Sequence, residues 1–502
     1  MKSTVTIIGS GFASLSAACY LAKAGYEVHV YEQNARLGGR ARQFEFGGYR
    51  FDMGPTWYWM PDVFERFFAD FGKKPSDYYE LERLSPAYKV YFGKDDHFTI
   101  PGTLEEIVTL FESKEVGAGN ALQRFITKAG SNYDVAIKNL VYKPGKNITE
   151  LITMDTITEV QQFFSAITST IRKNFKDFRL RQILEFPVLF LGAKPADTPQ
   201  FYSFMNYADF ALGTWHPKGG MYSVVKGMVA LAKELGVAFE TNAAVQSINV
   251  SENGVATSIT VNNDVIPVDI LISGADYKHS EDLLPEQFRA YSANYWETRT
   301  MAPSALLFYV GFNQPIQNVE HHTLFFDTSF DGHAEEIYDA PSWPKEPLFY
   351  ASFPSKSDNS MAPIGMENGI FLIPLAPDLE DTEEMRDKYF EMIMERMEIL
   401  IGQNVREHVL FQRSYCINDF KKDYNSFKGN AYGMANTLMQ TAFLRPKIKS
   451  KKVKNMFFTG QLTVPGPGVP PSLISGKIVS ESVINENSKS HDKRIQRAVV
   501  PV

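Results

Sequence analysis

The stretch that most limits the possible folds is "VTIIGSGFAS" (residues 5–14), because it reads as a buried strand that turns through two glycines into a helix. Gly9 permits the tight turn, and Gly11 lets the backbone approach a pyrophosphate closely. The N-terminus of the following helix offers free N–H groups and positive potential to such an anion. A second strand, "YEVHVYE", ends at Glu32. The sequence therefore predicts a strand–helix–strand unit that binds a dinucleotide.

Two residues of this unit refine the prediction. Ser14 stands where the usual pattern has its third glycine, but that position needs only a small residue for helix–strand packing. Glu32 ends the second strand, where a carboxylate accepts hydrogen bonds from a ribose 2′-OH and repels a 2′-phosphate. We therefore predict an unphosphorylated adenosine ribose at Glu32. This unit alone does not distinguish NAD from FAD.

A glycine pair follows Glu32 in "RLGGRARQ" (residues 36–43). The pair lets backbone come close to a ligand, and Arg40 and Arg42 offer donors to phosphate. The alternative is an ordinary Gly-Gly turn with solvated arginines. The position just after Glu32 favours a site beside the pyrophosphate.

Aromatic residues crowd the stretch "FDMGPTWYWMP" (residues 51–61), around Gly54, Pro55 and Thr56. Its rings either line an apolar pocket or belong to the core, and three successive aromatic residues cannot all face one core. The segments 186–195 and 201–215 are similarly rich in apolar rings and leave the same two readings open, lining or plain core helices.

Near the C-terminus, "FFTGQLTVPGPGVPPSLISGK" (residues 457–477) reads as a strand that ends at Gly460, a stiff loop and a helix that starts near Pro471. A helix N-terminus placed by such a loop stabilises negative charge, and a reduced flavin carries negative charge. The alternative is a simple proline-rich turn.

The composition limits the classes of function. A chain of 502 residues predicts two or more packed units, and a net charge of −7 argues against nucleic acid as a partner. The only cysteines, Cys19 and Cys416, cannot form a disulfide framework, so we expect core thiols in a reducing compartment. No apolar stretch is long enough to span a membrane. We expect a cytoplasmic protein without a metal site.

These segments, in the order "GSGFAS", "YEQNARLGGRA", "FDMGPTW", "WHPKGGM", "TNAAVQSI", "SGAD" and "TGQLTVPGPGVPPSLISGK", resemble the bacterial phytoene desaturase family of FAD flavoproteins, within the amine-oxidase-like superfamily. The chain is most similar to carotenoid desaturases of flavobacteria, and the resemblance spans about residues 1–485. It implies an α/β fold, in which a discontinuous Rossmann-like FAD-binding domain carries an inserted α+β substrate domain and a helical membrane-associating region.

The resemblance also implies boundaries and contacts. The FAD-binding domain would comprise residues 1–94, 219–292 and 410–487, the substrate-binding and membrane-associating domain residues 95–218 and 293–409, and a disordered tail residues 488–502. FAD would be bound non-covalently, because the C-terminal segment has no cysteine for a thioether. The residues expected to contact it are Gly9, Gly11, Ser14, Glu32, Gly39, Arg40, Gly54, Pro55, Thr56, Val245, Gly460, Val469 and Pro470. Gln461 stands where many flavin relatives carry an acidic residue.

The activity implied is dehydrogenation of a C40 polyene, phytoene to lycopene, with a 1-hydroxycarotenoid 3,4-desaturase as the alternative. A hydride would pass to the flavin, and a proton would leave the adjacent carbon. An amine oxidase and a non-catalytic isoprenoid-binding escort protein are the rivals from other classes. No catalytic residue is identified, because His216 is read either as a proton acceptor or as a structural histidine.

The expected partners are a hydrophobic carotenoid, a membrane surface, and a quinone or oxygen as electron acceptor. The protein would associate peripherally with the inner face of the cell membrane. The lysine-rich segment 444–455 is either a solvated face or a contact with anionic lipid.

Overall fold

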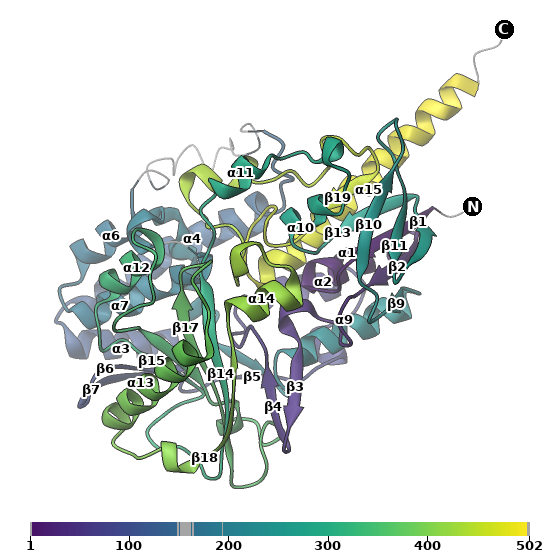
Figure 1. Cartoon of the computed structure of the whole chain (residues 1–502). Coiled ribbons are helices and arrows are strands. Elements are labelled where there is room, and N and C mark those ends of the chain that lie inside the picture. Colours follow the sequence, from purple (N-terminus) through teal and green to yellow (C-terminus); the bar gives the residue numbers. More distant parts are fainter. Residues whose placement is uncertain (1–2, 148–149, 151–161, 163–164, 193, 499–502) are drawn as a thin grey trace.

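The computed structural model describes residues 3–147, 150, 162, 165–192 and 194–498. A five-stranded parallel sheet gathers strands from both ends and the middle of the chain (Figure 1). In spatial order it consists of β19 (Met456–Phe458), β13 (Ile270–Ser273), β1 (Thr4–Ile8), β2 (Glu27–Tyr31) and β9 (Ala238–Glu240). The predicted strand–helix–strand unit is therefore confirmed, and so is its discontinuous setting.

Two helices that lie at opposite ends of the sequence pack against each other beside this sheet. They are α1 (Phe12–Lys23) and α15 (Val469–Ala498), and α9 (Tyr222–Glu234) also contacts α1. At the crossing, a Cβ on Gly476 would lie 2.4 Å from the Ala13 carbonyl oxygen, so the glycine sets how closely the helices approach. The Ser16 hydroxyl donates to the Leu473 carbonyl at 2.7 Å.

Smaller elements complete this domain. A three-stranded antiparallel sheet consists of β10 (Val245–Val250), β11 (Ala256–Val261) and β12 (Asp264–Pro267). A hairpin of β3 (Gln43–Phe46) and β4 (Tyr49–Asp52) leads into α2 (Pro61–Ala69), and α10 (Tyr277–Asp282) follows β13. Both cysteines are buried free thiols, as predicted.

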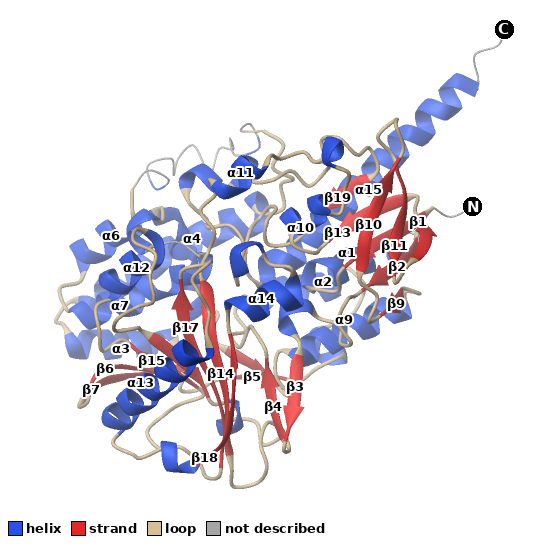
Figure 2. Cartoon of the chain, in the orientation of Figure 1, coloured by secondary structure: helices blue, strands red, loops and turns tan. Residues whose placement is uncertain are grey.

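A second large sheet forms the base of the other domain and is mostly antiparallel (Figure 2). Its order is β18 (Val409–Tyr415), β14 (Ser304–Phe312), β17 (Glu367–Leu375), β16 (Phe349–Ser352), β15 (His322–Phe325), β6 (Tyr88–Gly93) and β7 (Asp96–Ile100). Helix α13 (Glu383–Ile401) packs on it through Phe390, whose ring lies 5.2 Å from that of Phe308. Helix α12 (Phe330–Tyr338) and α14 (Ile417–Tyr424) lie beside the same sheet in Figure 1.

A helical region is inserted between β7 and β8 (Trp215–Pro217). Its main helices are α3 (Leu104–Lys114), α4 (Ala118–Val135), α6 (Ile167–Asn174), α7 (Phe178–Glu185) and α8 (Phe204–Phe210). Shorter turns are η3 (Ala136–Leu140), η6 (Phe186–Leu191) and η8 (Gln200–Ser203). Within the described ranges, no helix combines the length and apolar character that crossing a membrane requires.

The domain boundaries differ from the prediction at two strands. β6 lies before residue 94 but pairs with β15 in the seven-stranded sheet, and β18 begins at residue 409, at the edge of the predicted FAD-binding segment, but pairs with β14. Both strands therefore belong to the substrate side. Local patterns give the positions of strands, whereas hydrogen bonding to distant partners decides which sheet they join.

The tail predicted to be disordered from residue 488 is instead helical up to Ala498, because α15 continues through it. The helical part of this tail contains no proline or glycine, and its lysines, arginines, glutamine and alanine favour helices. Figure 1 shows the end of α15 projecting away from the body of the molecule.

Candidate functional site

The carboxyl ends of the parallel strands open into a cavity of about 610 Å³, which continues between the two domains. This edge of a parallel sheet is where ligands bind in α/β folds. The cavity is lined by every predicted cofactor residue except Ser14: Gly9, Gly11, Glu32, Gly39, Arg40, Gly54, Pro55, Thr56, Val245, Gly460, Val469 and Pro470. Residues separated by more than four hundred positions thus meet at one site.

The first turn shows why glycines stand there. Gly9 has a φ of 85°, and its N–H donates to the Tyr31 carbonyl at 2.8 Å, so its own backbone requires glycine. Gly11 has ordinary extended torsions, and no described protein atom lies within 4 Å of where its Cβ would stand. Because Gly11 lines the cavity, this open space fits a ligand that presses on the backbone.

Ser14 lies behind the cavity rather than in it. It is completely buried, and its hydroxyl has no hydrogen-bond partner among the described residues. It faces Gly274 at the end of β13, where a Cβ would lie 2.0 Å from the Ser14 Oγ. The serine is tolerated because the facing residue is glycine. Its expected contact with the cofactor is thus replaced by a role in helix–strand packing.

Glu32 presents its carboxylate at the edge of the cavity in a fixed orientation. One oxygen accepts from the Ser10 hydroxyl at 2.6 Å and the Ser10 N–H at 3.0 Å. The other accepts from the Asn34 N–H and side-chain amide, both at 2.9 Å. Glu32 is buried, so this network holds it in place for a ligand hydroxyl.

The two arginines of the second glycine turn have different roles. Arg42 forms an ion pair with Asp423 at 2.7 Å and does not line the cavity. Arg40 lines it, and its Nε is buried without a partner in the described part of the chain. With its amide oxygen turned toward Arg40, Gln461 accepts from that guanidinium at 3.0 Å. Burial lowers the pKa of Arg40, and its unused donor fits an anionic or oxygen-bearing group.

The aromatic stretch after Thr56 divides between the pocket and the core. Trp57 and Trp59 line the cavity, and the Trp59 indole donates to Thr214 at 2.8 Å. Tyr58 points the other way, is buried, and shares a 2.9 Å hydrogen bond with Tyr79. The pocket interpretation is therefore right for Trp57 and Trp59, and the core interpretation is right for Tyr58.

The part of the cavity away from the glycine turns is walled by apolar side chains. They include residues from both segments that the sequence left open between lining and core, together with strands and helices of the substrate domain. They are Phe186, Leu189, Phe201, Phe204, Met205, Leu324, Phe326, Phe330, Ile337 and Leu348. The arrangement suits an apolar ligand that extends away from the dinucleotide turn.

One polar group in this region was not predicted from the sequence. The Tyr350 hydroxyl shares hydrogen bonds with Thr56 at 2.8 Å and with His322 Nδ1 at 2.6 Å. The His322 ring stacks on Trp57, with centroids 4.0 Å apart. Burial, assisted by His216, holds the pKa of His322 well below its usual value, so the ring is neutral. No local motif marks Tyr350 or His322, because they lie on β16 and β15 without a surrounding pattern.

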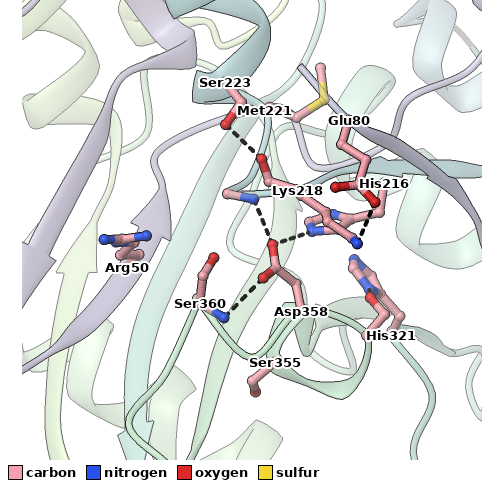
Figure 3. A network of polar contacts seen from close by, with 12 residues as sticks. Arg50, Glu80, His216, Lys218, Met221, Ser223, His321, Ser355, Asp358 and Ser360 are labelled. Carbon is pink, nitrogen blue, oxygen red and sulfur yellow. Dashed lines mark hydrogen bonds and ion pairs between the residues drawn. The ribbon is translucent and has the colours of Figure 1, made fainter. Parts of the chain in front are cut away.

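Of the two roles considered for His216, proton acceptor and structural histidine, the structure supports the structural one. It is buried, does not line the cavity, and places its Nε2 3.1 Å from an Asp358 oxygen (Figure 3). The Gly219 N–H donates to the same oxygen at 2.6 Å. Burial raises the pKa of Asp358, but these hydrogen bonds outweigh it and hold the pKa well below the usual range. The contacts of His216 and Gly219 with Asp358 thus connect β8 and the loop after it to the substrate domain.

Asp276 is a cavity residue that the motif "SGAD" contains but that was not singled out. It caps α10 by accepting from the Lys278 N–H at 3.0 Å, and its second oxygen accepts from the Phe427 N–H at 3.2 Å. The aspartate directly follows β13 and Ala275, which is the signal that would have identified it.

Comparison with known proteins agrees with this geometry. The family described as "Flavin containing amine oxidoreductase" matches residues 12–484. A "Carotenoid 3,4-desaturase" of Haloarcula japonica is 41% identical over 486 residues, which is 96% of this chain and 98% of that protein. A "4,4'-diapophytoene desaturase (4,4'-diaponeurosporene-forming)" of Staphylococcus aureus strain Newman is 30% identical and covers 96% of this chain and 99% of its own length.

The fold is also found in solved structures. An oxidoreductase from Methanosarcina mazei superposes with a TM-score of 0.64 at 17% identity, and the match covers 95% of this chain and 100% of the other. This likeness confirms the predicted fold class. The family match indicates that the cofactor of this site is a flavin.

Replacing Gly11 by alanine tests whether the open space belongs to the flavin. The flavin-free variant should keep its melting temperature, because the new Cβ meets no described protein atom. Overpacking against the cofactor costs about 1–3 kcal/mol, which is a loss of flavin affinity of about 5- to 150-fold. Flavin titration and thermal melting measure both effects.

Gly9→Ala is the control, because it strains a φ of 85° and should instead lower the melting temperature of the flavin-free form. Unchanged flavin affinity in Gly11→Ala would contradict the assignment.

Replacing Glu32 by lysine tests the ribose contact. We expect purified protein without flavin, because the carboxylate that accepts from Ser10 and Asn34 becomes a cation that cannot accept hydrogen bonds. Bound flavin per chain, released by heating and measured by absorbance, gives the result. Glu27→Lys, at the exposed start of the same strand, is the matched control. A Glu32→Lys protein that retains one flavin per chain would show that the site is assigned wrongly.

Proposed function

We propose, from the premise that this chain belongs to the family of flavin-containing amine oxidoreductases, that it is an FAD-dependent carotenoid desaturase. The observation that carries the proposal is the single cavity that joins the dinucleotide turn to an apolar, ring-lined space. A soluble polar substrate has no use for such walls, whereas a long polyene does. The relatives from Haloarcula japonica and Staphylococcus aureus are named as desaturases of this substrate class.

The flavin that fits best is non-covalent FAD. Glu32 favours an unphosphorylated ribose, and Gly11, Arg40 and the N-terminus of α15 provide for the pyrophosphate and the flavin ring. Cys19 and Cys416 are buried outside the cavity lining, so neither is placed for a thioether. When bound, FAD supplies the acceptor for a hydride from a C–H bond. The chain itself supplies binding, orientation and exclusion of water.

His333 and Tyr350, two ionisable groups of the apolar part, are neutral, which favours a hydrocarbon over an amine. Burial lowers the pKa of His333 to about 4, and its ring is held by the Pro374 carbonyl and the Leu348 N–H. Burial raises the pKa of Tyr350. An ammonium substrate would find no counter-charge among these groups. A carotenoid desaturase is therefore favoured over an amine oxidase.

Within this class, we assign the chain to 3,4-desaturation of a hydroxylated carotenoid, the alternative to the conversion of phytoene to lycopene. The support is the relative from Haloarcula japonica, which shares more of its sequence with this chain than the diapophytoene desaturase of Staphylococcus aureus does. A 3,4-desaturase acts near the end of the polyene, whereas phytoene desaturation takes place farther along the chain.

Pigment analysis in bacterial hosts that accumulate single carotenoids tests the assignment. A host with a 1-hydroxylated acyclic carotenoid should yield a product with one more conjugated double bond, absorbing at longer wavelength. A phytoene host should be unchanged. Conversion of phytoene to lycopene would overturn the 3,4-assignment, and a flavin-loaded enzyme that converts neither carotenoid would overturn the proposed function.

We further propose that the protein binds the inner face of the cell membrane peripherally, from which it takes its substrate and where a quinone, or oxygen, receives the electrons. The side chains of Met439 and Leu444 are exposed on either side of the cavity residues Thr441–Phe443. Two of the nearby lysines form hydrogen bonds within the chain: Lys447 donates to the Gly145 carbonyl, and Lys452 donates to the Gln287 carbonyl. An apolar contact is thus better supported than a basic one.

Liposome flotation tests this contact. The double variant Met439→Glu, Leu444→Glu should lose binding to liposomes, and high salt should change the binding of the wild type little, because apolar contact is not screened. Ile399→Glu, at an exposed apolar residue of α13, is the matched control. Binding that disappears in high salt would instead support contact with anionic lipid.

A further inference from the structure

Two phenol hydroxyls in the cavity have no hydrogen bond within the described residues. They belong to Tyr338, the last residue of α12, and Tyr432, in the loop after α14. Two other tyrosines that line the cavity have partners: Tyr350 has Thr56 and His322, and Tyr202 shares a 3.1 Å hydrogen bond with Thr441. Tyr338 and Tyr432 therefore differ from Tyr350 and Tyr202 in having hydroxyls that are available to a ligand.

Contacts of neighbouring residues position the backbone at both tyrosines. The Ala431 N–H donates to the Pro303 carbonyl at 3.0 Å, and the Gly433 carbonyl accepts from the Ala302 N–H at 2.8 Å. Hydrogen bonds on both sides of Tyr432 thus hold its backbone against residues 302–303, which directly precede β14. On the other ring, Asp339, directly after Tyr338, forms an ion pair with Lys194 at 2.8 Å. Donors held in this way lose little freedom when a ligand binds.

The two tyrosines line the same cavity and lie within electrostatic range of each other. Burial raises the pKa of Tyr338, and the nearby Tyr432 raises it further. Tyr432 raises the pKa of Tyr350 as well, after the larger effect of burial. Both tyrosines thus line the cavity that also contains Tyr350 and Thr56, and Tyr432 is the one within electrostatic range of Tyr350. A Cβ on Gly433 would lie 2.8 Å from the Gln461 side chain, which places the loop of Tyr432 against the C-terminal flavin segment.

We propose that Tyr338 and Tyr432 bind a hydroxyl group at the end of the polyene and determine the specificity for a hydroxylated carotenoid. This inference rests on the proposed function. An alcohol donates one hydrogen bond and accepts two, and a pair of phenols supplies matching donors and acceptors. A hydrocarbon end would leave both hydroxyls without partners in an apolar surrounding, which is unfavourable.

The position of the pair agrees with the chemistry of a 3,4-desaturase. In a 1-hydroxylated polyene, a single carbon, C2, separates the hydroxyl-bearing C1 from C3 of the reacting C3–C4 bond. The hydroxyl must then lie close to the site of dehydrogenation, and Tyr432 directly precedes Gly433, which packs against Gln461 of the C-terminal flavin segment. In phytoene desaturation no polar group comes near the reacting bond. A site built to bind a hydroxyl discriminates strongly against the analogue that lacks it.

Binding of paired ligands tests the inference. The holoenzyme is titrated with a 1-hydroxylated, already 3,4-desaturated carotenoid, which binds without turnover, and with the same polyene lacking the hydroxyl. We expect the wild type to prefer the hydroxylated ligand by about tenfold or more. Tyr338→Phe and Tyr432→Phe should each reduce this preference, and the double variant should abolish it. Affinity for the hydrocarbon should stay the same or increase.

Two controls separate recognition of the ligand hydroxyl from a general loss of binding. Tyr202→Phe removes a hydroxyl that lines the same cavity but already has a partner, and should leave the preference intact. Flavin content and the flavin absorption spectrum should be unchanged in the Tyr338 and Tyr432 variants. Loss of flavin would instead assign the hydroxyls to the cofactor, and an equal loss for both ligands would overturn a role in recognising the hydroxyl.

Turnover distinguishes the two levels of the proposal. A holoenzyme that converts the hydroxylated and the plain polyene with equal kcat/KM overturns the inference but leaves the desaturase assignment in place. A holoenzyme that converts neither overturns the proposed function itself. A higher KM for the hydroxylated substrate at unchanged kcat, in the double variant, supports binding of the hydroxyl in ground and transition state alike.

Discussion

The close crossing of α1 and α15 is the contact on which the site depends. Gly476 lets the backbones approach, and Ser16 and Ser480 donate to carbonyls of the opposite helix. The N-termini of both helices thereby reach one cavity, at Gly11 and at Val469. Two helix N-termini supply free N–H groups and positive potential in one place, which suits a diphosphate and the negative edge of a reduced flavin. A larger residue in the crossing would move one helix end away from the other.

The second determinant is the joint between the two large sheets. Thr56 follows the glycine turns of the dinucleotide side, whereas Tyr350 belongs to β16 of the seven-stranded sheet. Their hydroxyls meet at 2.8 Å, and His322 on the adjacent strand fixes Tyr350 from behind. Gly54 allows this joint to form, because a Cβ there would lie 2.4 Å from the Arg40 carbonyl oxygen. The cofactor side and the substrate side are thus connected by specific polar contacts rather than by apolar packing alone.

Burial gives the apolar part of the cavity its electrostatic character. It holds His322 and His333 neutral by lowering the pKa of each and keeps the tyrosines protonated by raising theirs. Charged side chains line the dinucleotide end, at Glu32, Arg40 and Asp276, and Lys143 and Glu150 also line the cavity. The cavity therefore combines charged groups at the dinucleotide turn with neutral histidines and tyrosines in its apolar part, as a nucleotide cofactor and a largely apolar substrate require.

The sequence by itself determined the features that depend on neighbours along the chain. These are the glycine turn after β1, the acidic end of β2, the C-terminal strand–loop–helix and, through resemblance, the discontinuous domain. Tertiary structure alone decided that Ser14 packs against Gly274, that Arg40 lines the cavity while Arg42 pairs with Asp423, and that β6 and β18 join the substrate sheet. It alone also placed Tyr338 and Tyr432 in one cavity. The reason is physical: turn and helix preferences act over a few residues, whereas the partners of a buried side chain come from segments that only the folded chain makes adjacent.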